Sequence, residues 1–380
     1  MKRKHIRINA FMFSVQGPVS LSSRVHPMTR RRRAFLRGAC FGRRLSLGCL
    51  LTLAFSGAAM ADGQQLCPDV SPLRIPNLDP FHHVYGVPAP QGACVLGRGT
   101  SEVTFSSDVA SHMTFAQSGT ERLLVDGETY RQSVALRYGL SDGWEGMLEV
   151  SMVSHTRGVF DGFIENWHDF FGLPQGGRDV TPRDRLAFVH SREGMVRVNV
   201  DQGITAPGDV MLGLGRRLEG NHFRNDGLAL RGAIRFPTGD ENALAGSGGA
   251  SVSLWAETSG DLFPREGSRT WLYGASLGVQ AGPQPSSLSG MGGRAIAFGH
   301  FGVTWQPLDR LSLTAQVDVN STPYTDSSLT PLSGPVVMFG AGGAYRISPN
   351  TTLEIAVSED DGWRHAAHDF GVHIALRRKM

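Results

Sequence analysis

Nine charged residues stand at alternating positions along segments that read as β-strands, each on the side opposite an apolar face. They are Arg131, Arg137, Glu145, Glu149, Arg231, Arg235, Glu257, Asp318 and Glu354. Guanidinium and carboxylate groups on neighbouring strands can bind a polar solute in a shared interior, or they can pair with one another. Arg137, for example, is within cross-strand reach of Glu145 and Glu149. The pattern therefore predicts either a solute site or a structural ion-pair network.

The strands that position these charges are clearest between residues 128 and 154. From residue 131 to residue 138, Arg, Ser, Ala and Arg alternate with Gln, Val, Leu and Tyr, which is the two-residue period of a strand. Ser141-Asp142-Gly143 predicts a tight turn, and the following strand has Glu145 on the side of Arg137. The segment predicts a β-hairpin with one apolar and one charged face.

The same alternation recurs to the end of the chain and predicts about twelve strands, from 100–112 to 370–376. Weaker patterns at 186–190 and 195–200 predict a further hairpin within the long interruption 156–207. Antiparallel barrels of bacterial outer membranes have an even number of strands, short periplasmic turns and long external loops. The alternation of short and long connections along this chain is typical of that arrangement.

The separation of charged and apolar faces decides the fold class. An arginine facing lipid at mid-depth costs about 2–4 kcal/mol, which enforces such a separation in every strand. A periplasmic β-sandwich would show the same separation and is the alternative. Aromatic residues near strand ends favour the membrane: Tyr138, Trp144, Trp271, Trp305 and Tyr345. We predict a transmembrane antiparallel up-and-down β-barrel of about 12 strands, with one short amphipathic helix in an external loop.

The first 61 residues read as an export signal. They hold 12 of the 37 Lys and Arg and none of the 34 Asp and Glu, so residues 62–380 carry 25 basic against 34 acidic side chains, a net charge of −9. That charge argues against nucleic acid as a partner. Ala59-Met60-Ala61 is a small-residue cleavage site after an apolar stretch. Translation could begin at Met28, and Arg32-Arg33 leaves twin-arginine export open beside the general route.

Residues 62–98 form a proline-rich segment without a clean period. It is either a periplasmic tail or a plug folded into the barrel formed by residues 99–380, and we favour the plug. Cys67 and Cys94 are the two cysteines after the signal. Export to an oxidising compartment makes them a disulfide candidate, with two free thiols as the alternative.

Apolar side chains at helical spacing predict an amphipathic helix within residues 160–171, followed by Gly172-Leu173-Pro174 as a stop. If this helix folds over the barrel mouth as a lid, Phe163, Trp167 and Phe171 would contact an apolar ligand. Its other side carries Asp161, Glu165 and His168, whose spacing could suit a metal. A solvated polar face is the commoner explanation, so no metal and no cofactor are predicted.

Two Ser-His pairs raise the question of a membrane lipid hydrolase. They are Ser154-His155 and His190-Ser191. Adjacent residues of a strand point to opposite faces, so neither pair is well placed for a nucleophile and a base to meet. We predict no catalytic residue and no enzyme activity, and a membrane lipid hydrolase is the less favoured alternative.

Several motifs are spread over the chain after residue 61, namely Pro76-Asn77-Leu78-Asp79-Pro80, Gly86-Val87-Pro88, Asp126-Gly127-Glu128-Thr129-Tyr130, Arg137-Tyr138-Gly139-Leu140, Val153-Ser154-His155, Trp167-His168-Asp169, Gly172-Leu173-Pro174 and Phe236-Pro237-Thr238-Gly239-Asp240. Together they resemble an uncharacterised bacterial outer-membrane β-barrel family (domain of unknown function 3187 type). The resemblance implies the fold and the cell outer membrane, and it supplies no activity. The last motif alone is similar to barrels related to fatty-acid and aromatic-compound transporters. The chain departs from the usual barrel end, because Arg377-Arg378-Lys379-Met380 follows the last strand in place of an aromatic residue.

The function predicted is passive uptake or binding of a small molecule, which could be hydrophobic. The alternative is a structural envelope barrel without transport. The partners expected are outer-membrane lipid, the barrel-assembly machinery and a small-molecule ligand, with no nucleic acid.

Overall fold

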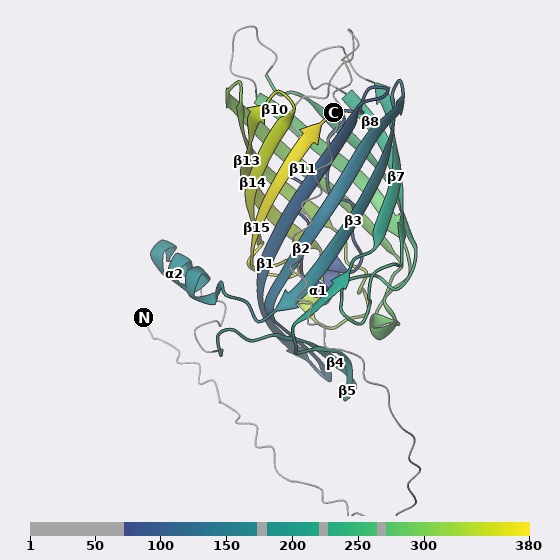
Figure 1. Cartoon of the computed structure of the whole chain (residues 1–380). Coiled ribbons are helices and arrows are strands. Elements are labelled where there is room, and N and C mark those ends of the chain that lie inside the picture. The colour runs from purple at the N-terminus through teal and green to yellow at the C-terminus, as the bar shows by residue number, and fades with distance from the viewer. Residues whose placement is uncertain (1–71, 173–180, 220–226, 264–270) are drawn as a thin grey trace, which may run out of the picture. The chain divides into compact units, whose positions relative to one another are not determined.

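A closed barrel dominates the fold (Figure 1). The computed structural model describes residues 72–172, 181–219, 227–263 and 271–380. The ring closes because β1 (Ser101–Ser118) pairs with both β2 (Glu121–Ser141) and β15 (Phe370–Lys379). The other barrel strands are β3 (Trp144–Thr156), β7 (Val210–Glu219), β8 (Gly227–Phe236), β9 (Ser251–Asp261), β10 (Trp271–Ala281), β11 (Ala295–Leu308), β12 (Leu311–Asn320), β13 (Val336–Ser348) and β14 (Thr351–Asp360). Neighbours are antiparallel throughout, which confirms the predicted barrel of about twelve strands and excludes two stacked sheets.

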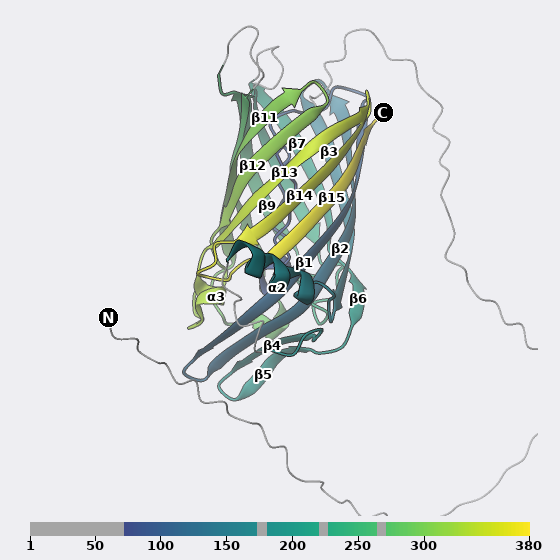
Figure 2. The ribbon, with the colours of Figure 1, turned by 90° about the vertical axis from the view of Figure 1, so that its left-hand side faces the viewer.

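Three further strands extend the sheet beyond the barrel wall. They are β4 (Ala187–Arg192), β5 (Met195–Val200) and β6 (Ile204–Pro207). β4 pairs with the first residues of β2 and with β5, and β6 pairs with the end of β3. The β1–β2 hairpin thus continues past the barrel and carries β4 and β5 with it (Figure 2). The hairpin predicted from residues 186–200 is present.

Helices are few and short. α1 (Pro80–His83), η2 (Ser286–Leu288) and α3 (Thr330–Ser333) each make about one turn, and α2 (Asp161–Phe171) is the predicted amphipathic helix. Within the described residues, no helix has the length and apolar character needed to cross a membrane. α2 lies on the outside of the barrel wall, where the Phe163 ring is 6.0 Å from that of Phe370 at the start of β15 (Figure 2).

The two ends of the barrel differ. At the short-turn end, two-residue turns join β11 to β12 and β13 to β14, and β1 begins beside the end of β15, with Ser101 and Met380 exchanging backbone hydrogen bonds of 2.9 and 2.8 Å. The long-loop end carries residues 157–172, 181–209, 237–250, 282–294, 321–335 and 361–369, as well as α1, α2 and α3 (Figures 1 and 2). This is the predicted asymmetry between periplasmic turns and external loops.

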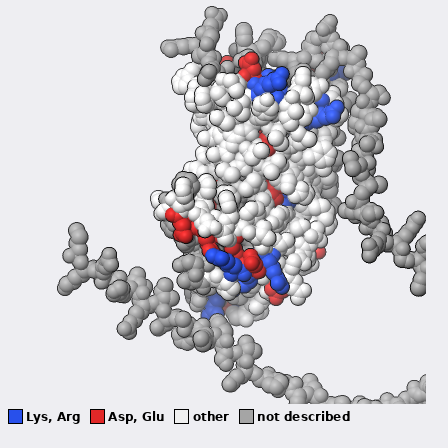
Figure 3. Space-filling model, turned by 60° about the vertical axis from the view of Figure 1, so that its left-hand side comes forward, with Lys and Arg blue, Asp and Glu red and all other residues white. Residues whose placement is uncertain are grey.

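Burial is inverted relative to a soluble protein. Large apolar side chains of the wall face outward and are exposed, Phe105 by 57% and Leu277 by 73%, whereas Glu145 and Arg231 on the inner face are 0% exposed. In a space-filling view the wall is largely uncharged between charged side chains gathered near its two ends (Figure 3). An apolar belt of this kind is stable only when hydrocarbon surrounds it. The barrel is therefore a membrane-spanning one.

Candidate lumen site

Residues 72–98, the lumen segment, run inside the barrel. Because this segment forms no sheet, its backbone groups bond to inward-facing side chains of the wall. The Leu73 N–H donates to Oε1 of Gln316 at 3.0 Å, and Nε2 of Gln316 donates back to the Leu73 carbonyl at 3.0 Å. Near the other end of the segment, the Leu96 N–H donates to Oε2 of Glu145 at 3.0 Å. The wall therefore holds the segment through polar side chains.

A first ionic network joins residues of five strands near the short-turn end. Nη1 of Arg137 is 3.1 Å from Glu102, and its Nη2 is 2.7 Å from Oε2 of Glu145. Arg231 bridges the other oxygen of Glu145, at 2.7 Å, to Glu257, at 2.9 Å. The carboxylate of Glu145 thus forms ion pairs with both Arg137 and Arg231. With charges this deeply buried, the pairing must be nearly complete for the barrel to fold.

The same arginines hold the lumen segment. Arg231 donates to the Gly92 carbonyl at 2.8 Å, and Nη2 of Arg137 donates to the Cys94 carbonyl at 2.7 Å. A Cβ atom at Gly139 would lie 1.9 Å from the carbonyl oxygen of Gly97, so strand β2 and the segment touch backbone to backbone. Cys94 is in a disulfide bond, while Cys67 lies outside the described residues, so their pairing stays a prediction.

A second network lies farther from the short-turn end, on β14, β15, β1, β2 and β3. Arg131 pairs with Glu149 and lies 3.6 Å from Asp108, and Arg74 of the lumen segment also reaches Glu149, at 3.2 Å. His373 joins this network to Glu354, since its Nδ1 is 2.5 Å from Asp108 and its Nε2 is 3.2 Å from Glu354. Here too the acids and bases pair closely.

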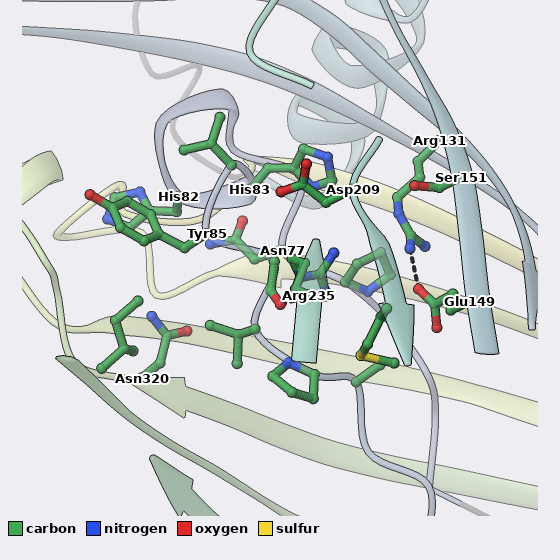
Figure 4. Close-up of a pocket in the computed structure, with 18 of the residues that line it drawn as sticks. Asn77, His82, His83, Tyr85, Arg131, Glu149, Ser151, Asp209, Arg235 and Asn320 are labelled. Carbon is green, nitrogen blue, oxygen red and sulfur yellow. Dashed lines mark hydrogen bonds and ion pairs between the residues drawn. The ribbon is translucent and has the colours of Figure 1, made fainter. Parts of the chain in front are cut away.

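Arg235 is the exception among the lumen arginines. Its Nη2 donates to the Gly86 carbonyl at 2.6 Å, and among the described residues it forms no ion pair. It lines a cavity of about 60 Å³ between the lumen segment and the wall. Figure 4 shows Arg235 in the middle of this cavity, with Asn77 and His83 of the lumen segment close by and the Arg131–Glu149 pair to one side. A second cavity of about 60 Å³ is lined by His300, Asp318 and Asn320. Each has room for a few water molecules or a very small solute.

An apolar core fills the barrel at the long-loop end. This loop-end core consists of Phe81, Val84, Tyr85, Leu123, Val125, Leu186, Phe188, Val198, Val200, Leu244, Leu288, Met291, Ile296, Tyr324, Leu329 and Leu332. It joins α1 to the long loops and to the extension β4–β5, and the Tyr324 hydroxyl donates to the Phe81 carbonyl. Burial of Tyr324 raises the pKa of its hydroxyl well above the ordinary value. Smaller apolar clusters also lie along the inner wall, and one of them contains Leu73 and Ile75 of the lumen segment.

His368 ties the lumen segment to the loop 361–369. Its Nδ1 accepts a hydrogen bond from the Leu78 N–H at 3.2 Å, and its Nε2 is 2.7 Å from the Ser358 hydroxyl. Burial lowers the pKa of this histidine to about 4. The neutral ring, with Nδ1 free to accept, is the form that this contact requires.

The nine predicted lumen charges all lie on the inner wall, and the structure adds partners that the sequence did not single out, above all Arg74 and His373. The aromatic residues predicted to form a lid lie elsewhere. Phe163 and Trp167 are 50% and 40% exposed on the outside of the wall, not over its mouth, and the side chain of Phe171 is outside the described part of the chain. An exposed aromatic face at the level of the lipid-facing wall explains this position.

The other residues weighed from the sequence are engaged in local contacts. His155 bonds to Thr129 at 3.0 Å, whereas the Ser154 hydroxyl bonds to Thr205 at 2.8 Å on the other face of the strand. His190 bonds to Glu121 at 3.0 Å. On α2, Glu165 pairs with Arg183 and Asp161 accepts from the Asp184 N–H at 2.9 Å.

One group among the described residues could hold a metal ion. Ligand atoms of Asp360, His365 and Asp369 lie within 4.8 Å of one another in the last long loop. Nδ1 of His365 is 3.0 Å from Asp360, and this hydrogen bond raises the pKa of the histidine. The ion pair by itself accounts for the arrangement of these two side chains.

Fold and interior together define a membrane-spanning β-barrel with a chain segment inside it, a class whose fold points to the outer membrane. The chain belongs to the family described as "Protein of unknown function (DUF3187)", which matches residues 49–380. A comparison with curated proteins finds no match.

Among solved structures, the chain is similar to an outer membrane channel from Pseudomonas putida F1, with 12% identity, coverage of 76% of this chain and 97% of that one, and a TM-score of 0.47. It is similar to the NanC porin, with 11% identity, coverage of 74% and 100%, and a TM-score of 0.41. It is also similar to the Pseudomonas putida toluene transporter TodX, with 12% identity, coverage of 74% and 88%, and a TM-score of 0.31. Because these scores lie below 0.5, the fold of this chain rests on its own strand pairing.

Proposed function

We propose that this protein is an outer-membrane channel that binds a small molecule in its lumen and lets it pass when the lumen segment moves. The observation that supports this is the polar attachment of the segment to the wall. Its backbone bonds to Gln316, Glu145 and the lumen arginines, and water can replace each such bond at a net cost of about 0.5–1.5 kcal/mol. Leu73 and Ile75 of the segment also belong to a small apolar cluster on the wall, and exposing it adds to the cost of moving the segment.

The alternative is a structural envelope barrel in which residues 62–98 are a permanent filling. The ionic network of Arg137, Glu145 and Arg231 favours it, because it would stiffen the barrel whether or not anything passes. The two functions predict different results when the contacts of the lumen segment are weakened. A channel should then conduct ions or solutes, and a permanently filled barrel should not.

We extend the proposal to export and assembly. Residues 1–61 are taken as a signal that is cleaved after Ala61, and residues 62–98 as the plug. The wall then contacts outer-membrane lipid, and the last strand, β15, offers the assembly machinery Phe370 and the apolar residues that follow it. Amino-terminal sequencing of the protein purified from outer membranes should give Asp62 as the first residue.

Conductance in a planar bilayer tests the channel. Gln316→Ala removes the two hydrogen bonds to Leu73 and should raise the open probability or conductance of the full-length mature protein. Gln132→Ala is the matched control, since Gln132 lies on the outer face of β2 and bonds only to Ser107 there. If wild type and Gln316→Ala both carry no current and neither admits solutes in liposome swelling, the structural barrel is the correct function.

A further inference from the structure

Arg235 has a chemical environment unlike that of the other lumen arginines. Arg137 and Arg231 each contact two carboxylates, and Arg131 contacts Glu149 with Asp108 nearby. The residues opposite Arg235 on the neighbouring strands are Met211 on β7 and Ser251 on β9, neither of which is acidic. Register alone thus leaves this guanidinium without a carboxylate partner among the described residues.

The acids that do line the same cavity are already engaged. Glu149 is held by Arg131 and Arg74. Both oxygens of Asp209 accept hydrogen bonds, from the Gly239 N–H at 2.8 Å, from the Ser247 N–H at 2.9 Å and from the Ser247 hydroxyl at 2.7 Å. Arg235 has five N–H groups, and within the described part of the chain one of them, on Nη2, has a bonded partner, the Gly86 carbonyl. Nε and Nη1 have no partner among these residues and can donate to a ligand.

The backbone of the lumen segment fixes the guanidinium in place. Gly86 has a φ of +56°, and a Cβ atom there would lie 2.3 Å from Cζ of Arg235. Glycine is therefore required both by the backbone conformation and by the flat guanidinium that packs on it. This contact orients the guanidinium of Arg235 relative to the cavity. A planar guanidinium can donate two parallel hydrogen bonds to a planar carboxylate.

Two arginines act on the ring of His83 in this cavity. Burial lowers the pKa of His83 well below its ordinary value, and Arg131, His155 and Arg235 lower it further. The charges of Glu149 and Asp209 also act on Arg235, but both carboxylates are bonded to other groups. An anion beside His83 and Arg235 would supply the bonded carboxylate that Arg235 lacks among the described residues.

We propose that this cavity, lined by Arg235, His83 and Asn77, is a binding site for a small carboxylate or a similar oxyanion. The inference rests on the proposed channel function and names the class of its solute. A volume of about 60 Å³ admits a carboxylate head group and excludes a large organic molecule while the lumen segment is in place. A longer carboxylic acid would bind by its head group.

The experiment measures binding of acetate to the full-length mature protein in nanodiscs by isothermal titration calorimetry, with acetamide as the neutral ligand of equal size. We expect saturable binding of acetate, none of acetamide, and a loss of at least about tenfold in acetate affinity in Arg235→Gln. Arg310→Gln, which removes an exposed arginine at the short-turn end, should bind acetate as wild type does.

Two further variants keep the test decisive if Arg235→Gln fails to fold. Arg235→Lys retains the positive charge but lacks the planar guanidinium. It should bind acetate more weakly than wild type but better than Arg235→Gln. Gly86→Ala retains Arg235 but displaces its guanidinium, and should also weaken acetate binding. Equal affinity for acetate and acetamide in wild type, or an unchanged affinity in Arg235→Gln or Arg235→Lys, overturns the anion site.

Bilayer conductance of the same samples separates the two proposals. If current is carried but acetate does not bind, the anion site is wrong and the channel stands. If acetate binds and no current is carried even in Gln316→Ala, the site stands and the channel is wrong.

Discussion

Different interactions stabilise the two ends of the lumen. Near the short-turn end, Glu145 and Arg231 lie in an ionic network with the backbone of the lumen segment bonded to it. At the long-loop end, Phe81, Phe188 and Tyr324 belong to an apolar core that resembles the interior of a soluble domain. Polar contacts can be exchanged for water, while an apolar core loses most of its stability when it opens. We infer that the loop-end core is the harder of the two barriers to passage.

The largest effect is expected at Glu145. Glu145→Ala leaves Arg137 and Arg231 without their shared carboxylate inside the barrel, which should cost about 3–5 kcal/mol in the free energy of unfolding. Denaturant unfolding in detergent micelles, followed by tryptophan fluorescence, measures it. Asp201→Ala, at an exposed site between β5 and β6, is the control and should change stability by less than about 0.5 kcal/mol. A loss below about 1 kcal/mol in Glu145→Ala would mean that water already reaches this network.

A pH-dependent effect is expected at His368, in the loop 361–369 at the long-loop end. Its folded pKa of about 4 lies below the unfolded value of 6.5, so between these values the unfolded chain binds the extra proton and acidification destabilises the fold. Stability contributed by the neutral ring is complete above about pH 6.5 and falls by up to about 3 kcal/mol as the pH drops to 4.

The measurement for His368 is the unfolding free energy at pH 7.5 and pH 4.5 for wild type and His368→Gln. The variant keeps an acceptor for the Leu78 N–H and lacks the titration, so its loss on acidification should be smaller. Identical pH dependence in the two proteins would show that other histidines account for the acid sensitivity.

The smallest effect is expected at Tyr324 in the loop-end core. Tyr324→Phe removes the hydrogen bond to the Phe81 carbonyl and keeps the ring, so the expected cost is about 1 kcal/mol. The core would remain closed, and conductance of this variant should match that of wild type. A marked rise in current would instead show that this hydroxyl holds α1 in place and that the core opens easily.

The sequence predicted the wall well because its information is local. The two-residue period that puts Arg137 and Glu145 on one face needs only neighbouring residues to be read. Which charged residues pair with one another cannot be read locally, because it depends on the register between strands, which barrel closure fixes. This register places Arg235 between Met211 and Ser251. It also brings Glu145 within reach of two arginines.

The lumen segment was harder to predict for a different reason. Its backbone bonds to side chains from distant strands, as Leu73 does with Gln316, so its own sequence shows no period. The helix at residues 160–171 had a readable period, but its position outside the wall depends on contacts with distant segments, such as that of Phe163 with Phe370. Amphipathicity predicts a helix and leaves open what its apolar face meets.

The central claim is that the apolar face of every barrel strand contacts lipid and the charged face encloses the lumen. Spin labels on Ser312→Cys and Leu313→Cys, adjacent on β12 with the first 6% and the second 42% exposed, test it directly in reconstituted membranes. The label at 313 should be relaxed strongly by oxygen dissolved in lipid and the label at 312 weakly. Equal oxygen accessibility at both positions, or the reverse order, would contradict the account.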